Sequence, residues 1–282
     1  MSASDPLPDR TGFVEAAVNY LDRMDVRPRF YATDYSRDNL VLRPERMPIR
    51  DARRIESAPA LEREGFTLLP HNSRVTDFRD AERAPREYLP EIERLLGDLT
   101  GAAAVVMLGG AVLRFGERSG EYGSRVNTRP ARFVHVDYTP ASIPGLLEPV
   151  LAARGIDARD YSGYAGFNIW RVLSAPPQDV PLCLCDARSV SDEDLVPGDA
   201  VFDAPDAPEF SFEAYLVRHN PAHRWFYYRD MTPAEVLVFK AYDSRPGEPV
   251  RVPHVAFDDP SCPEGVTPRA SVEVRGFAFF AD

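Results

Sequence analysis

Short runs of hydrophobic residues, separated by prolines and glycines, fill the chain from about residue 101 onward. These runs are rich in valine, phenylalanine, tyrosine and tryptophan, which favour β-strands. They cover residues 104–115, 131–139, 166–173, 180–187, 223–228, 235–243 and 271–280. Because only one clear helical pattern, at 146–154, lies between them, they predict a sandwich or jelly roll rather than a parallel sheet.

The first hundred residues have a different pattern, with scattered charges and many prolines. Apolar residues recur at helical spacing over 11–24 and, more clearly, over 85–99. No repeat or low-complexity linker marks a domain boundary. We therefore expect a single domain over 1–282, in which 1–100 form a helical and irregular flank. Residues 101–282 would form a mainly β core, a cupin-like double-stranded β-helix or jelly roll.

The charge of the chain narrows the choice of partner. Its 282 residues include 44 acidic and 33 basic side chains, for a formal net charge of -11. Such a field repels phosphate backbones, so we expect a small-molecule substrate and no nucleic acid. No apolar stretch approaches the roughly 18 residues of a membrane span. The first residues lack an export signal, so we expect a cytoplasmic monomer or homodimer with its three cysteines reduced.

One predicted strand carries a candidate metal site. His135 and Asp137 are two residues apart on an extended segment, so both side chains leave the same face. An imidazole and a carboxylate in one cavity make two thirds of a 2-His-1-carboxylate site, which holds ferrous iron and leaves positions open. The third ligand would come from a distant strand. His254, in the segment VPHVAFDDP, is the candidate.

A candidate anion-binding pair follows His254. Arg269 and Ser271 are again two residues apart on one predicted strand face. A guanidinium beside a hydroxyl suits a carboxylate, because it offers paired hydrogen bonds. In a β-rich chain, the order His-x-Asp, distal His and Arg-x-Ser is typical of a jelly-roll dioxygenase that uses 2-oxoglutarate.

Several segments together resemble the CmcJ/NvfI/AsaB-like family of Fe(II)- and 2-oxoglutarate-dependent oxygenases. They are FVHVDYTP, FNIWRVL, PLCLCDARSV, NPAHRWFYYRDMTPAEVLVFKAYDS, PHVAFDDP and PRASVEVRGFAF. The resemblance covers about residues 101–280 and implies an enzyme that hydroxylates, desaturates or otherwise oxidises a natural product. It implies Fe(II), 2-oxoglutarate and O2 as cofactor and co-substrates, with release of succinate and CO2. By motif, His135, Asp137 and His254 would hold iron and Arg269 would hold 2-oxoglutarate.

Other residues have competing interpretations. His219 and His223 have the spacing of a zinc pair on a helix, but Pro221 between them opposes that helix. His223 is also an alternative third iron ligand. Lys240, the only lysine, would form a structural salt bridge or assist in binding the co-substrate. Arg275 is the alternative to Arg269 as the anchor of the co-substrate carboxylate. Glu273, on the same strand face, could instead pair with Arg275 in a structural ion pair.

The strand 166–173 offers two possible pocket faces. Asn168 and Trp170 point one way and Arg171 the other, and Asn168 is a further candidate for co-substrate binding. Two alternative functions remain open at this point. One is an iron oxidase of the same fold that does not use 2-oxoglutarate, and the other is a jelly-roll binding protein without catalytic activity.

Overall fold

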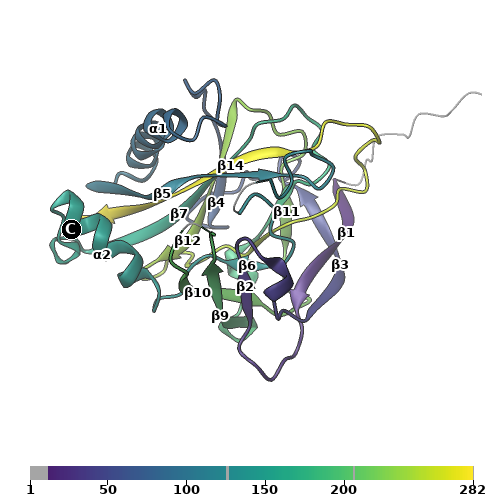
Figure 1. Cartoon of the computed structure of the whole chain (residues 1–282), viewed down its shortest axis with the longest axis horizontal. Helices are drawn as coiled ribbons and strands as arrows, with labels where there is room; N and C mark the ends of the chain where they lie inside the picture. The colour runs from purple at the N-terminus through teal and green to yellow at the C-terminus, as the bar shows by residue number, and fades with distance from the viewer. Residues whose placement is uncertain (1–11, 125–126, 206, 282) are drawn as a thin grey trace, which may run out of the picture.

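Two β-sheets form the body of the protein, with one helix outside the smaller sheet and a second at its end (Figure 1). The computed structural model describes residues 12–124, 127–205 and 207–281. The larger sheet has nine strands in the order β1-β3-β11-β8-β13-β6-β10-β9-β2. The smaller sheet has five, in the order β4-β12-β7-β14-β5. This mainly β, jelly-roll architecture confirms the predicted fold class.

The strands of the larger sheet come from the whole length of the chain. Their bounds are β1 Phe13–Leu21, β2 Arg29–Tyr31, β3 Leu42–Asp51, β6 His135–Val136, β8 Leu182–Cys185, β9 Leu195–Phe202, β10 Phe210–Val217, β11 Trp225–Tyr227 and β13 His254–Ala256. The strands of the smaller sheet are β4 Phe66–Pro70, β5 Ala104–Phe115, β7 Gly163–Val172, β12 Glu235–Asp243 and β14 Ala270–Phe280. The two helices are α1 Arg83–Thr100 and α2 Ile143–Arg154, both close to their predicted positions.

The predicted helix over 11–24 is wrong, because this segment contains β1. In FVEAAVNYL the residues Val14, Ala16, Val18 and Tyr20 are buried, whereas Glu15 and Ala17 are exposed. This alternation has the period of two expected of a strand. The strand pairs along its whole length with β3, so the first hundred residues add strands to both sheets as well as supplying α1.

Helix α1 covers the outer face of the smaller sheet (Figure 1). Its buried residues Tyr88, Ile92 and Leu96 pack in one hydrophobic cluster with Val272 and Val274 of β14. Because neighbouring residues of a strand point to opposite faces, Ser271, Glu273 and Arg275 point to the inner face, between the two sheets. The fold therefore aims the polar side chains of β14 into the interior.

The polar face of β7 points the same way. In the register of the smaller sheet, Asn168 lies opposite Arg275, and Trp170 lies opposite Glu273. Directly opposite residues of antiparallel strands share a face, so Asn168 and Trp170 are on the inner side. Arg171 points outward, where it bonds the Tyr88 hydroxyl of α1 at 3.1 Å. The structure thus decides between the two possible pocket faces of this strand.

Candidate active site

The three predicted ligands meet near the middle of the larger sheet. His135 begins β6 and His254 begins β13, and the two residues are partners in the register of these strands. Asp137 follows β6 directly. One possible ligand atom from each residue lies within 4.8 Å of the other two, and all three side chains are buried. Among the described residues, this is the one group of three or more His, Cys, Asp or Glu side chains that converges in this way.

Both imidazoles are held in the orientation that a metal ligand needs. His135 Nδ1 lies 3.0 Å from the Phe133 carbonyl oxygen, and His254 Nδ1 lies 3.2 Å from that of Val252. An Nδ1–H that donates to a carbonyl leaves Nε2 with a free lone pair. The two Nε2 atoms lie 3.4 and 3.9 Å from Asp137 Oδ1. Burial, followed by repulsion from His135, lowers the pKa of His254 to about 3, which keeps it neutral.

Asp137 has one oxygen engaged and one turned toward the histidines. Its Oδ2 accepts hydrogen bonds from Asn168 Nδ2 at 2.7 Å and Arg275 Nε at 2.5 Å. Burial alone would raise the pKa of Asp137, but the Arg275 guanidinium and the histidines lower it well below its usual range. The group is therefore an ionised carboxylate whose Oδ1 is available to a metal. Two imidazole nitrogens and one carboxylate oxygen match the donor set of a non-haem ferrous site.

Sequence reasoning did not find the contact between Arg275 and Asp137. It predicted a pair between Arg275 and Glu273, which is present, but Arg275 bridges both carboxylates. Asn168, predicted to contact the co-substrate, donates a hydrogen bond to the metal-ligand candidate Asp137. The alternation along β7 placed Asn168 on a possible pocket face. This alternation does not indicate which side chain of another strand Asn168 contacts.

A cavity of about 300 Å³ lies in front of these ligands. His135, Asp137 and Arg275 form part of its wall. The remaining wall is largely aromatic or apolar, with further arginines, and comes from strands of the larger sheet and from residues of segments 30–42, 114–122 and 127–133. Its size and composition are those of a small-molecule site.

Arg269 is fully buried and lacks a salt bridge among the described residues. Its Nη1 donates to the Val180 carbonyl at 2.8 Å, and its Nε has no hydrogen-bond partner. Burial, together with repulsion from Arg132 and Arg114, lowers the pKa of Arg269 to about 9. A buried cation beside other cations is costly unless an anion joins it. Ser271, also fully buried, lies two residues further along β14.

Lys240 does not lie with the predicted co-substrate residues. Its Nζ is 2.8 Å from Asp243 Oδ2 and 2.6 Å from Glu248 Oε2. The preceding residue, Phe239, packs its ring on His254, so the Lys240 side chain points to the opposite face of β12. The structural salt bridge, one of the two roles that the sequence offered for Lys240, explains its position.

His219 and His223 lie together near Tyr20, not at the ligand cluster. His223 Nδ1 is 3.1 Å from the Tyr20 hydroxyl, and its Nε2 is 3.2 Å from Asp194 Oδ2. The His219 ring packs edge-on against Tyr20. His223 is thus engaged on both nitrogens by protein groups, which favours His254 as the third iron ligand.

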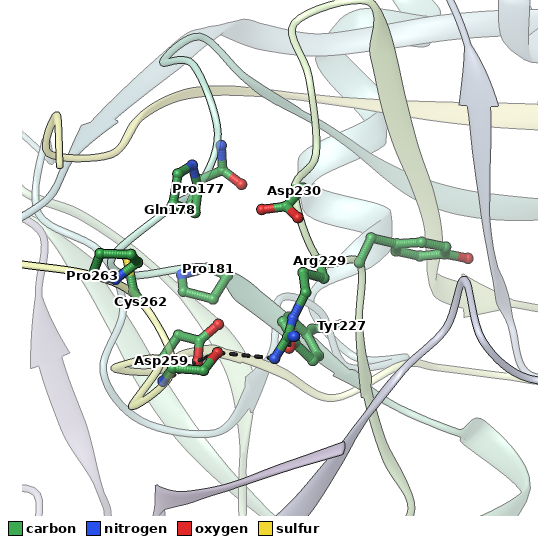
Figure 2. Close-up of a pocket in the computed structure, with 11 residues that line it drawn as sticks. Pro177, Gln178, Pro181, Tyr227, Arg229, Asp230, Asp259, Cys262 and Pro263 are labelled. Atoms are coloured by element: carbon green, nitrogen blue, oxygen red, sulfur yellow. Dashed lines mark hydrogen bonds between the residues drawn. The ribbon is translucent and has the colours of Figure 1, made fainter. Parts of the chain in front are cut away.

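A second, smaller hollow lies between the ends of β8 and β11 and the loop before β14 (Figure 2). Arg229 and Asp259 face each other across it, and Arg229 Nη2 donates to the Ser261 hydroxyl at 2.9 Å. Burial raises the pKa of the Cys262 thiol in its wall, which lowers its reactivity. None of the predicted site residues lines this hollow.

A jelly-roll fold with an inward-facing His-x-Asp and distal His defines the class of non-haem iron oxygenases. Within that class, the chain belongs to the CmcJ/NvfI/AsaB-like family of Fe(II)- and 2-oxoglutarate-dependent oxygenases. A family model described as "Oxidoreductase/YMDC permease-like domain" matches residues 18–279.

Curated relatives support this membership, and a solved structure has the same fold. "Hydroxylase/desaturase efuI" of Hormonema carpetanum is 30% identical over 250 residues, 83% of each chain. "Alpha-ketoglutarate-dependent dioxygenase phiK" of a fungal species is 30% identical over 252 residues, 87% of each chain. A structure titled "iron and alpha-ketoglutarate-dependent endoperoxidase NvfI with different conformation" has the same fold, with a TM-score of 0.81 and 24% identity over 97% of this chain and 100% of that one.

No helix in the described part of the chain is both long and apolar enough to cross a membrane. By its family membership, the chain is an oxidoreductase.

Proposed function

We propose that this protein is an Fe(II)- and 2-oxoglutarate-dependent dioxygenase that hydroxylates, desaturates or otherwise oxidises a small natural product. The observation that carries the proposal is the convergence of His135, Asp137 and His254, with both Nε2 atoms and one carboxylate oxygen turned toward one another. Two relatives, named as a hydroxylase/desaturase and an α-ketoglutarate-dependent dioxygenase, support the same chemistry.

Each residue of the site has a distinct role in this proposal. His135, Asp137 and His254 hold the iron, and Arg275 and Asn168 fix the second oxygen of Asp137. Ferrous iron held by these residues would supply the redox chemistry that links the decarboxylation of 2-oxoglutarate, to succinate and CO2, with oxidation of the substrate by O2. The largely apolar cavity wall keeps water from the reacting centre and orients the substrate.

Arg269 and Ser271 hold the distal carboxylate of 2-oxoglutarate in this proposal. The support is a buried guanidinium without a carboxylate partner among the described residues, whose Nε hydrogen is unused. An arriving carboxylate would supply the missing charge and accept that hydrogen bond. The Ser271 hydroxyl, two residues further along the chain and 3.5 Å from the Arg114 carbonyl oxygen, can add a further donor.

The direct test is iron-dependent formation of succinate from 2-oxoglutarate. We expect His135→Ala, Asp137→Ala and His254→Ala each to abolish it, because each removes one ligand. His223→Gln serves as the control, since His223 is held by Tyr20 and Asp194. Full activity of His254→Ala combined with loss in His223→Gln would reverse the ligand assignment. Substrate oxidation without stoichiometric succinate would instead indicate an iron oxidase that does not use 2-oxoglutarate.

The anchor for 2-oxoglutarate is tested by Arg269→Ala. Loss of a charge-assisted pair should raise the Michaelis constant for 2-oxoglutarate by about 30- to 1000-fold, equivalent to about 2 to 4 kcal/mol. Arg269→Lys should recover only part of this loss, because an ammonium cannot donate two parallel bonds. An unchanged constant in Arg269→Ala would remove Arg269 from this role.

A further inference from the structure

The cavity in front of the iron ligands has two chemically different parts. One part is apolar and aromatic, with Phe30, Leu42, Phe133, Phe202 and Phe212 in its wall. The other part is formed by two arginines and two tyrosines, namely Arg114, Arg129, Tyr35 and Tyr122, and is called the arginine pocket below. An apolar wall and a cationic wall in one cavity select a ligand that has both an apolar body and an anionic group.

The Arg129 guanidinium is oriented by contacts with two tyrosine rings. Its guanidinium carbon lies 4.5 Å from the centre of the Tyr35 ring and 5.0 Å from that of Tyr122. Gly123 has a φ of +67° and lies close to the Arg129 side chain. A Cβ at this position would lie only 3.0 Å from Arg129 Nε, so the absence of a side chain permits the close approach. The ring contacts fix the plane of the guanidinium without consuming its hydrogen-bond donors.

Arg129 also lacks a counter-charge. Its Nε is buried without a hydrogen-bond partner, and no ion pair of Arg129 is found within the described part of the chain. Such an unsatisfied charged donor is expensive in the free protein. A ligand oxygen is the group that would satisfy it.

Arg114 adds a second positive charge that is bonded to neutral groups. Its Nη1 donates to Asn127 Oδ1 at 2.8 Å and to the carbonyl oxygens of Asn127 and Arg129 at 3.1 and 2.8 Å. The other two arginines of the cavity wall differ in this respect. Arg132 is paired with Glu117 and Asp258, and Arg275 with Asp137 and Glu273. The unbalanced positive charge is therefore concentrated in the arginine pocket.

The carboxyl of Asp38 in the same wall does not cancel this charge. Its Oδ1 accepts a hydrogen bond from the Tyr31 backbone N–H at 2.7 Å. Burial and the neighbouring carboxylates of Asp203 and Asp34 raise the pKa of Asp38 to about 6. Asp38 is thus engaged by the backbone, and no ion pair joins it to Arg114 or Arg129 within the described residues.

We propose that the substrate is an apolar organic acid whose carboxylate binds to Arg129 and Arg114, with its apolar body against the phenylalanines beside His135. The inference rests on the proposed function and specifies its substrate class. It assigns this anion to a different place from the distal carboxylate of 2-oxoglutarate, for which Arg269 is the expected anchor. The arginine pocket therefore determines which end of the substrate faces away from the iron ligands.

The test uses two probes of the same shape, naphthalene-2-carboxylate and naphthalene-2-carboxamide. Equilibrium dialysis with the full-length protein should show the carboxylate binding about 10- to 100-fold more tightly than the amide, as expected for a charge-assisted pair. Arg129→Gln should remove most of this difference, and Arg129→Lys should retain part of it. Arg154→Gln is the matched control, because this substitution changes the net charge by the same amount. Arg154, at the end of α2, pairs with Glu93 of α1 and does not line the cavity.

Circular dichroism shows whether the Arg129→Gln variant is folded. The affinities of the variant for Co(II) and for 2-oxoglutarate show whether it retains the iron site. Both affinities should match the wild type. Equal binding of the two probes, or binding of neither, would overturn the inference while leaving the iron chemistry intact. Loss of 2-oxoglutarate affinity in Arg129→Gln with unchanged probe binding would also overturn it, because Arg129 would then serve the co-substrate. Failure of the wild type to bind Co(II) would contradict the proposed function itself.

Discussion

Arg275 controls how Asp137 can act as a ligand. A free carboxylate can bind a metal through one oxygen or both, and it can rotate between these states. Here Oδ2 receives hydrogen bonds from Arg275 and Asn168, so Oδ1 is left facing the histidines. Outer groups of this kind typically change metal affinity or activity by about 10- to 100-fold when they are removed.

We therefore expect Arg275→Ala to weaken metal binding by about 10- to 100-fold, and Asn168→Ala by less, because a neutral amide gives a weaker bond than a guanidinium. Anaerobic titration with Co(II), followed by its visible absorption, measures the affinity. Arg159→Ala is the control, since Arg159 is exposed and pairs only locally with Asp157. Unaltered affinity in Arg275→Ala would show that Asp137 needs no such support.

The residues of the candidate metal site could be singled out from the sequence because each has few alternatives. The chain has five histidines, and the pair His135 and Asp137 has the spacing of one strand face. The contact between Arg275 and Asp137 was not predictable, because it depends on the register between β14 and its neighbours. That register shifts between Glu273 and Arg275, opposite Gly109 and Gly110 of β5, where Gly109 has a φ of +62°. Sequence spacing alone does not reveal such a bulge.

Among the elements, helix α1 is the one that the sequence specified most fully. Its apolar residues recur at three and four positions, and its end is marked by Gly101 in the left-handed conformation. Strand β1 was misread because alanines favour helices, and its alternation is weak in a segment that begins with Phe13 and contains Ala16 and Ala17. Its inward side chains are buried against residues of distant strands, among them Trp225 and Val255, a tertiary effect that local spacing does not encode.

The packing of α1 on the smaller sheet gives a prediction about stability. Ile92 is fully buried between α1 and the outer faces of β7 and β14. Ile92→Ala should lower the free energy of unfolding by about 2 to 5 kcal/mol, because it leaves a cavity in this cluster. Arg94→Ala on the exposed face of the same helix should change it by less than about 0.5 kcal/mol. Urea unfolding followed by circular dichroism compares the two, and equal effects would contradict the packing described here.

At the scale of the whole molecule, the order of strands in the two sheets could not be predicted from the sequence. The neighbours of β6 are β13 and β10, far along the chain, and β11 is parallel to β3. The jelly-roll class could be predicted from strand-like runs and from the family resemblance. The pairing of distant strands depends on the simultaneous packing of both sheets, which no local pattern contains.

Stability should fall in mild acid because buried histidines are neutral. Burial lowers the pKa of His223, partly opposed by Asp194, and burial also lowers the pKa of His71. The unfolded chain, with histidine pKa values of about 6.5, then binds more protons than the folded one as pH falls below that value. We expect the free energy of unfolding to decrease from pH 7 to pH 5. His223→Gln should show a smaller decrease in urea titrations at the two pH values. A decrease as large as that of the wild type would exclude His223 as a contributor.

Removal of metal should cost stability without unfolding the protein. The hydrophobic clusters of both sheets are built from residues other than the three ligands, so the core does not need the metal. Binding to the folded state alone adds about 2.7 kcal/mol when free metal is 100 times its dissociation constant. For a chain of this size that corresponds to a rise in Tm of roughly 5 to 10 °C. Scanning calorimetry with Co(II) and then with a chelator measures the shift. Asp137→Ala should show no difference between Co(II) and chelator, since its site lacks the carboxylate. A chelated protein without a cooperative transition would show that the metal is structural, because closing the site would then be a condition for pairing β6 with β13.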